Sequence, residues 1–427
     1  MIIALLWILA AGVVATLVYV TGRLLYDIYG VVKQRRYDKS IGQLAPLWRD
    51  SKVIAIVAQV AFAIVIGLIL SYLWGNFTAR TDAIGLKLSF DFLDQPAGIT
   101  IADNSLSPAS TVSGALTAGF FNTLRIIAIG IPSAVVLGTV VGIARLSSNW
   151  LLRKLATGYV EFLRNIPPAV VIVAVWSAVY LTSFPRAADS WEPLGLFVFN
   201  NSRFAFPSVE GLDNFATFRW ILLVALVAAV AVAWWRTKKF IETGTAHHRV
   251  LWGLGTFFGI AIVAFAALGG PAKFSLPTVD DGGRVYDGGI RMQMPYAAVV
   301  SALVLYTATH IAEIVRGSIQ AVHRGQVEAS EALALSKFQQ YRFVILPQAM
   351  RIAFPPLINQ FLNFSKNSSL ALLIGFGEIT SIITNLAGQS QPAPQLILIL
   401  MLLYLVISLA LSAIGNLANR RLQIVGR

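Results

Sequence analysis

Polar side chains at helical spacing lie within one of the long apolar stretches of the chain. Asn359, Asn363 and Lys366 follow one another at intervals of four and three residues, so a helix would place them on one face. An ammonium group and amide N–H groups are hydrogen-bond donors that suit a carboxylate ligand. The alternative is that Lys366 pairs with Glu378, with Glu313 or with a backbone carbonyl and only fixes helix packing. The candidate pathway residues of this face are Asn359, Asn363, Lys366, Ser368 and Ser369.

Two more ionisable residues lie in or beside apolar stretches, where a charge near the bilayer centre costs about 3 kcal/mol or more. Glu313 precedes Arg316 by three residues, so an ion pair along one helix explains it as well as contact with a solute does. Arg125 is expected near the outer end of a long span, from where its side chain can reach the headgroups. Both residues are kept as pathway candidates. Gly138 and Gly142 form a small-xxx-small pair that indicates close helix packing.

The segment 316–352 is the most informative polar stretch, because it is predicted to form two short helices instead of turns. The first helix runs over about 326–335 and is rich in Ala. Ser336 and Gln339 have the S-x-x-Q form of a capping box, which begins a second helix, and Pro347 is expected to interrupt it. Two helices at an angle make a compact elbow that can dock into the groove of a partner. The alternative is a stable loop without a partner.

The composition places these residues in a membrane. Hydrophobic residues make up 57% of the 427 positions and charged residues 12%, and the mean hydropathy is +0.72. Apolar runs of about 20 residues can cross a hydrocarbon core of about 30 Å as helices, which predicts an all-α integral membrane protein. The chain has no cysteine and four scattered histidines, so no disulfide, metal site, cofactor or catalytic residue is expected.

The distribution of basic residues predicts the topology. Loops on one side hold 23 of the 33 Lys and Arg residues and loops on the other side hold 7, so the N-terminus faces out and the C-terminus faces in. The first span lacks a basic n-region and a cleavage site, so a retained anchor is expected. The net charge of +13 then reflects cytoplasmic loops and lipid headgroups, not nucleic acid. The nine predicted spans are 2–22, 53–74, 115–144, 169–184, 219–235, 250–270, 295–315, 353–387 and 395–414.

The elbow resembles the EAA loop of type I ABC importer permeases, and the wider pattern resembles their polar amino-acid branch over about residues 45–420. The resemblance implies that the elbow seats on an ATPase subunit through Gly325, Glu328, Ala329, Ser330, Ala332, Ala334, Leu346 and Pro347. The matching segments are 312–317 (Ala-Glu-Ile-Val-Arg-Gly), 325–329 (Gly-Gln-Val-Glu-Ala), 346–349 (Leu-Pro-Gln-Ala), Asn359, Lys366 and 368–370 (Ser-Ser-Leu), with 122–124, 145–147 and 159–167 upstream.

The resemblance also implies partners and a division of labour. The chain looks like the long, general L-amino-acid kind of permease, which works with a second, different permease, two copies of an ATPase and a periplasmic or extracellular binding protein in the lipid of the bacterial inner membrane. No G-x-x-x-x-G-K-[ST] loop is present, so ATP hydrolysis is expected in the partner and not in this chain. The alternatives are a gradient-driven secondary transporter, for which no inverted repeat is found, and a membrane enzyme.

Two departures from the family pattern lie in the elbow. Ala334 stands where the family usually has Gly, and Ser330 replaces an Ala. As a residue within a helix, Ala334 is expected to cost little and even to stabilise the elbow by about 1 kcal/mol relative to Gly. The expected organisation is an extra anchor and basic linker at 1–52, a first family helix with its periplasmic loop at 53–114, and the permease domain at 115–427.

Overall fold

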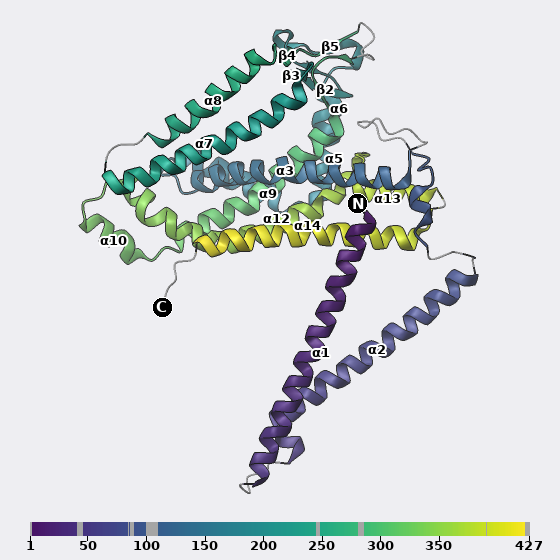
Figure 1. Cartoon of the computed structure of the whole chain (residues 1–427). Coiled ribbons are helices and arrows are strands. Elements are labelled where there is room, and N and C mark those ends of the chain that lie inside the picture. The colour runs from purple at the N-terminus through teal and green to yellow at the C-terminus, as the bar shows by residue number, and fades with distance from the viewer. Residues whose placement is uncertain are drawn as a thin grey trace. The chain divides into compact units, whose positions relative to one another are not determined.

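The chain is helical in a computed structural model (Figure 1). The structure describes residues 2–40, 46–83, 85, 89–99, 110–244, 248–280, 286–389 and 391–422. The helices are α1 (Ile2–Ser40), α2 (Ser51–Ala83), α3 (Val112–Ala144), α4 (Trp150–Arg164), α5 (Pro168–Ala174), α6 (Leu181–Ser183), α7 (Phe215–Thr243), α8 (Arg249–Ala267), α9 (Met294–Gln320), α10 (Arg324–Ala332), α11 (Lys337–Gln339), α12 (Leu346–Asn367), α13 (Ile379–Gly388) and α14 (Ala393–Leu422).

Short helical segments and strands complete the chain. The segments η1 (Leu47–Arg49), η2 (Asp91–Asp94), η4 (Ala187–Asp189), η5 (Pro193–Gly195) and η7 (Ser368–Ile374) are 3₁₀-helical, and η3 (Val175–Tyr180) and η6 (Gln340–Ile345) are π-helical. The strands are β1 (Val198–Phe199), β2 (Arg203–Phe206), β3 (Ser208–Gly211), β4 (Ala272–Ser275), β5 (Thr278–Val279), β6 (Tyr286–Asp287) and β7 (Ile290–Gln293).

Six helices of the described residues are long and apolar enough to cross a bilayer: α2, α3, α7, α8, α9 and α14. Two bent helix pairs meet the same test, which gives up to eight candidate spans. A polytopic helical membrane fold is therefore confirmed. The predicted count of nine spans and the predicted orientation stay predictions. The expected first span, 2–22, lies within α1, where most of the side chains are outside the described part of the structure.

The predicted span 353–387 is wrong as a single helix. The helix that contains α12 and η7 ends at Ile374, and α13 starts at Ile379 with a bend of 48° between the two parts. Gly375 has φ +73°, which L side chains rarely adopt, and it ends the first part. Because the residues on either side of Gly375 are apolar, hydropathy alone does not reveal this break.

The chain divides into two compact units, and each has its own core. Unit 1 comprises residues 1–161 and 307–427, and unit 2 comprises residues 162–306. In unit 1, α12 packs against α14 and α3 packs against α13. A buried apolar cluster joins the segment 92–99 to one end of α3, to α13 and to α14. Of the predicted periplasmic loop up to residue 114, positions 84, 86–88 and 100–109 lie outside the described residues.

Glycines allow α3 to approach its neighbours closely in unit 1. A Cβ at Gly138 would lie 2.6 Å from Ile311 Cβ, and one at Gly142 would lie 2.8 Å from the Ala312 carbonyl oxygen of α9. A Cβ at Gly130 would meet the ring of the fully buried Phe364 on α12. The small-xxx-small pair is thus a packing site, and α3 holds both α9 and α12 in place.

Unit 2 contains strands that the all-α prediction lacked. β2 pairs antiparallel with β7, and β3 pairs antiparallel with β4. These pairs join the two predicted exterior loops, 185–218 and 271–294, across the α7–α8 hairpin. The two loops therefore lie on the same side of the hairpin, as the alternating loop assignment requires. The strands are only two to four residues long, and Phe204 and Val209, which favour extended structure, stand among turn residues in the sequence.

Candidate functional site

The first helix of the elbow ends in a Schellman motif. Helix α10 stops at Ala332, the Ala334 N–H donates to the Glu331 carbonyl (2.9 Å), and the Leu335 N–H donates to the Ser330 carbonyl (3.2 Å). Ala334 occupies the left-handed position of this motif with φ +55°. The prediction that Ala334 lies within a helix and stabilises it relative to Gly is wrong. A Cβ in the left-handed region clashes with its own backbone and costs about 1–2 kcal/mol.

The second helix begins as predicted and then continues further than predicted. Ser336 Oγ accepts from the Gln339 N–H and the Gln339 side chain accepts from the Ser336 N–H, so the capping box is confirmed. Pro347 does not interrupt the helix. The chain remains helical from Lys337 through the π-helical η6 into α12, and Pro347 falls in the first turn after η6. The wider π turn accommodates a residue that has no N–H.

A buried hydrogen-bonded contact joins the two arms of the elbow. The Gln340 amide donates to Ser330 Oγ (2.7 Å) and to the Val327 carbonyl (3.2 Å), and Ser330 Oγ donates to the Val327 carbonyl (2.6 Å). Ser330 and Gln340 are each 2% exposed. Apolar packing of Val322, Ile345 and Ala349 lies beside this contact. The arms are thus held at one angle by both packing and hydrogen bonds.

The outer surface of the elbow is exposed and combines large apolar side chains with charged ones. Leu333 and Phe338 are 74% and 71% exposed. Glu328 is exposed and pairs with Arg324 along α10 (3.3 Å). Glu331 pairs with Lys337 across the turn (2.8 Å), and the hydrogen bond from this ammonium lowers the pKa of the Glu331 carboxyl below its usual value. Such a surface suits contact with a protein partner.

The other predicted coupling residues surround this surface. Ala329 and Ala332 are exposed on α10, and Ala334 is exposed at the turn. The Gly325 N–H donates to His323 Nδ1 at the start of α10 (3.1 Å). Further along, Leu346 is exposed and Pro347 is half-buried. The predicted set is therefore mostly exposed, with Ser330 as the buried member.

The predicted polar face is present on α12. Asn359, Asn363 and Lys366 are exposed and lie one turn apart along the helix. Among the described residues, the Lys366 ammonium forms no ion pair or side-chain hydrogen bond, so the proposed pairing with Glu378 or Glu313 does not occur there. Ser368 is buried and Ser369 half-buried, and their hydroxyls donate to the carbonyls of Ser365 and Lys366. The two serine hydroxyls thus form hydrogen bonds within their own helical segment, whereas the side chains of Asn359, Asn363 and Lys366 are exposed.

Glu313 forms ion pairs with two arginines. Its Oε2 accepts from Arg145 at the end of α3, and its Oε1 accepts from Arg316 one turn later on α9. The Arg145 side chain is only 12% exposed. Both carboxylate oxygens are therefore used, and the helix-packing explanation fits Glu313 better than contact with a solute.

Arg125 lies near the middle of α3. Helix α3 begins at Val112, so Arg125 stands close to its midpoint, Ala128, and not near its outer end. Its guanidinium donates to Asn122 Oδ1 (3.4 Å), and the Asn122 amide donates to the Gly377 carbonyl (2.8 Å). Arg125 thus lies beside the break between η7 and α13. Since α3 is a candidate span, a cation within it is expensive unless a polar environment surrounds it.

Glu378 is a buried residue whose role the sequence did not reveal. It is 0% exposed, and its carboxylate caps α13 by accepting from the N–H groups of Thr380 (2.9 Å) and Ser381 (2.8 Å). The Tyr404 hydroxyl of α14 donates to the same group (3.3 Å), and Thr123 Oγ1 of α3 accepts from the Ile379 N–H (3.2 Å). An acidic residue directly before Ile-Thr-Ser is the sequence signal of this cap.

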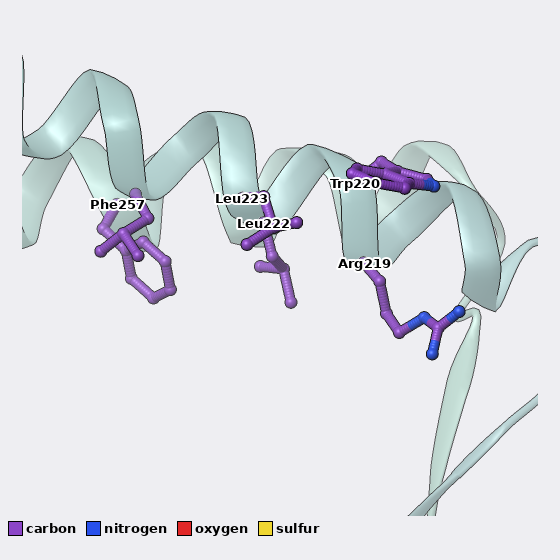
Figure 2. A pocket seen from close by; sticks show the side chains of 6 residues that line it. Arg219, Trp220, Leu222, Leu223 and Phe257 are labelled. Carbon is purple, nitrogen blue, oxygen red and sulfur yellow. The ribbon is translucent and has the colours of Figure 1, made fainter. Parts of the chain in front are cut away.

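A groove with a volume of about 500 Å³ lies elsewhere, between α7 and α8 in unit 2. Figure 2 shows the Arg219 guanidinium at one end of this groove and Phe257 at the other. This groove is lined by apolar side chains and a single guanidinium. A site for a polar solute usually has several polar groups that point toward one another, and the groove lacks them. The lining suits acyl chains. It consists of Arg219, Trp220, Leu222, Leu223, Leu226 and Phe257.

Comparison with known proteins shows to which family the chain belongs. The family model described as "Binding-protein-dependent transport system inner membrane component" matches residues 134–424. The general L-amino acid transport system permease protein AapQ of Rhizobium johnstonii is 35% identical over 386 residues, which are 88% of this chain and 94% of that protein.

Two other relatives differ in how much of the chain they match. The glutamate/glutamine/aspartate/asparagine transport system permease protein BztB of Rhodobacter capsulatus is 30% identical over 90% of this chain and 97% of its own length. The glutamine transport system permease protein GlnP of Escherichia coli is 36% identical over 31% of this chain and 60% of its own length. With most of its length matched by the family model and by two long relatives, the chain belongs to the family of binding-protein-dependent transport system inner membrane components.

Proposed function

We propose that this chain is the permease subunit of an ATP-driven importer of polar L-amino acids. The relatives named for general L-amino acids and for glutamate, glutamine, aspartate and asparagine support the substrate class. The observation that carries the proposal is the elbow, a rigid pair of helical arms with exposed Leu333 and Phe338 beside the exposed Glu328. The elbow seats on a separate ATPase, one copy for this chain and one for its partner permease.

The polar face of α12 is the proposed contact for the substrate. Asn359, Asn363 and Lys366 present donors to the carboxylate that all amino acids share. Their exposure on this chain supports a pathway completed by a second, homologous permease, and the length shared with the long relatives favours a heteromeric pair. A binding protein that carries an amino acid docks on the exterior loops. The two ATPases then close, and the elbows transmit this motion to the permeases. The polar face of α12 thereby changes from access on one side of the membrane to access on the other.

The protein resides in the bacterial inner membrane with nine spans, the N-terminus outside and the elbow inside. The excess of Lys and Arg in alternate loops supports this placement. The chain binds no cofactor of its own and leaves ATP hydrolysis to the partner.

Uptake of labelled amino acids into vesicles tests the coupling role, with this chain reconstituted beside its partner permease, ATPase and binding protein. Glu328→Arg reverses an exposed charge of the docking surface. We expect it to lower ATP-dependent uptake at least about ten-fold, as opposite charges at an interface become like charges. We also expect the ATPase to be lost during co-purification.

Glu242→Arg is the matched control, because Glu242 is an exposed residue of another predicted cytoplasmic segment, at the end of α7. It should leave uptake and co-purification unchanged. Normal uptake with Glu328→Arg would disprove docking through this surface. If uptake persists without the ATPase and depends on an ion gradient, the chain is a secondary transporter and not a subunit of an ABC importer.

A further inference from the structure

Gln340 is the buried polar residue of the elbow that the coupling proposal does not use. Its amide reaches from the second arm into the first and donates to both Ser330 Oγ and the Val327 carbonyl. At 2% exposure the amide has no access to bulk water. A buried amide without a partner would cost free energy, so these bonds are needed at one relative position of the arms.

Ser330 accepts hydrogen bonds through both its carbonyl and its hydroxyl oxygen. Its carbonyl closes the Schellman motif with the Leu335 N–H, and its hydroxyl accepts from Gln340. Ser330 is also a departure from the usual Ala of the resembling loop, and an Ala at this position could not accept a hydrogen bond. The hydroxyl at 330 and the amide at 340 therefore form a matched pair that joins the two arms.

The other polar contacts between the arms are exposed. The Glu331–Lys337 pair has side chains that are 53% and 78% exposed, and the Gln326–Gln348 contact is 3.3 Å long and exposed. Exposed pairs contribute little to a fixed geometry because water competes with them. Within the described part of the elbow, the bonds from Gln340 to Ser330 and to Val327 are the buried directional contacts between the arms, and they add a fixed direction to the apolar packing beside them.

We propose that Ser330 and Gln340 are positioning residues that fix the angle between the arms, so that motion of the ATPase passes to α12 without loss in the elbow. The inference rests on the proposed coupling function. Helix α12 continues from the second arm and carries the polar face, so a change at the Gln340 contact reaches Lys366 through a continuous helix. The contact does not need to touch either the nucleotide or the substrate.

The test combines the structure of the elbow with the efficiency of coupling. The chain has no cysteine, so spin labels at Arg324→Cys and Arg342→Cys report the distance between the arms without background. Gln340→Leu should broaden this distance distribution. It should also lower the amount of amino acid imported per ATP hydrolysed by about five-fold or more, because both bonds from the Gln340 amide are lost, while the ATPase still co-purifies.

Ser330→Ala should act in the same direction, and it is the milder variant should Gln340→Leu fold poorly. Adding Ser330→Ala to Gln340→Leu should have little further effect, because Gln340→Leu already removes the bond to Ser330 together with the bond to Val327. Gln59→Leu, at an exposed position of α2, is the matched control and should change neither readout.

Unchanged distances and unchanged import per ATP in Gln340→Leu would overturn the inference, and loss of import with Glu328→Arg would then leave the coupling role standing. If Glu328→Arg has no effect, the coupling proposal fails by itself. The label distances, measured on the chain without the ATPase, still report whether Gln340 fixes the elbow.

Discussion

At the scale of single residues, the elbow combines strain with a compensating contact. Ala334 is in the left-handed region, where its Cβ is unfavourable, yet the turn forms because both Schellman hydrogen bonds and the Ser336 cap hold the chain on either side. Glycine would adopt the same conformation without the clash. Ala334 therefore lowers the stability of the turn, and the Ser330–Gln340 hydrogen bond helps to hold the two arms at their observed angle.

Ala334→Gly should stabilise the protein by about 1 kcal/mol, because the left-handed backbone is then free of strain. Ala329→Gly is the matched control, since Ala329 is exposed and lies inside α10, where Gly costs about 0.5–1 kcal/mol. Thermal unfolding of both variants in detergent measures the difference. A lower midpoint for Ala334→Gly would mean that the turn is not left-handed in the folded protein.

Local signals predicted some of these residues and could not predict others. Ser336 and Gln339 were correct because a capping box depends on residues three positions apart. Ser330 departs from the family pattern, which is visible in the sequence. Its partner Gln340 lies on the other arm, and the two residues meet only because of the angle at the turn, which the sequence does not show. Glu378 likewise caps its own helix, whereas its contact with Tyr404 depends on tertiary packing.

At the scale of elements, hydropathy predicted where the helices are and not how they bend. In the run that contains α12, η7 and α13, the residues on either side of Gly375 are apolar, and the break there is fixed by Gly375 and by hydrogen bonds from Asn122 and to Thr123. The second arm continues through Pro347 because η6 widens the turn before it. Both features depend on backbone geometry, which composition does not encode.

The polar face of α12 makes a prediction of its own. Lys366→Gln should raise the KM for uptake by about ten-fold or more, because a charged hydrogen bond to the substrate carboxylate is lost. The assembly of the two permeases and the ATPase should be unchanged. Arg351→Gln, near the start of the same helix, is the matched control. Loss of the permease pair, with an unchanged KM in what remains, would instead assign Lys366 to helix packing.

At the scale of the whole molecule, contacts within each unit test whether alternate loops share a side. The Gln389 amide of the 388–394 loop region donates to the Gly98 carbonyl of the 75–114 loop (3.1 Å). At the opposite end of α3, Arg145 meets Glu313 next to the elbow. In unit 2, β2 and β7 join the loops 185–218 and 271–294. The first and third contacts join loops to which the charge count gave the same side, and the second joins such a loop to the cytoplasmic end of the predicted span 295–315.

The remaining question at this scale is which side faces out, and cysteine labelling of the chain, which has no native cysteine, answers it. Val209 of β3 is 59% exposed in a predicted exterior loop, and Ala329 is exposed on the elbow. In intact spheroplasts, an impermeant maleimide should label Val209→Cys but should reach Ala329→Cys and Tyr37→Cys only after the membrane is opened. A cysteine inserted after Met1 should be labelled from outside, because an odd number of spans separates the two termini. Protection of that N-terminal cysteine, with the other three sites as expected, would remove 2–22 from the spans and place both termini inside.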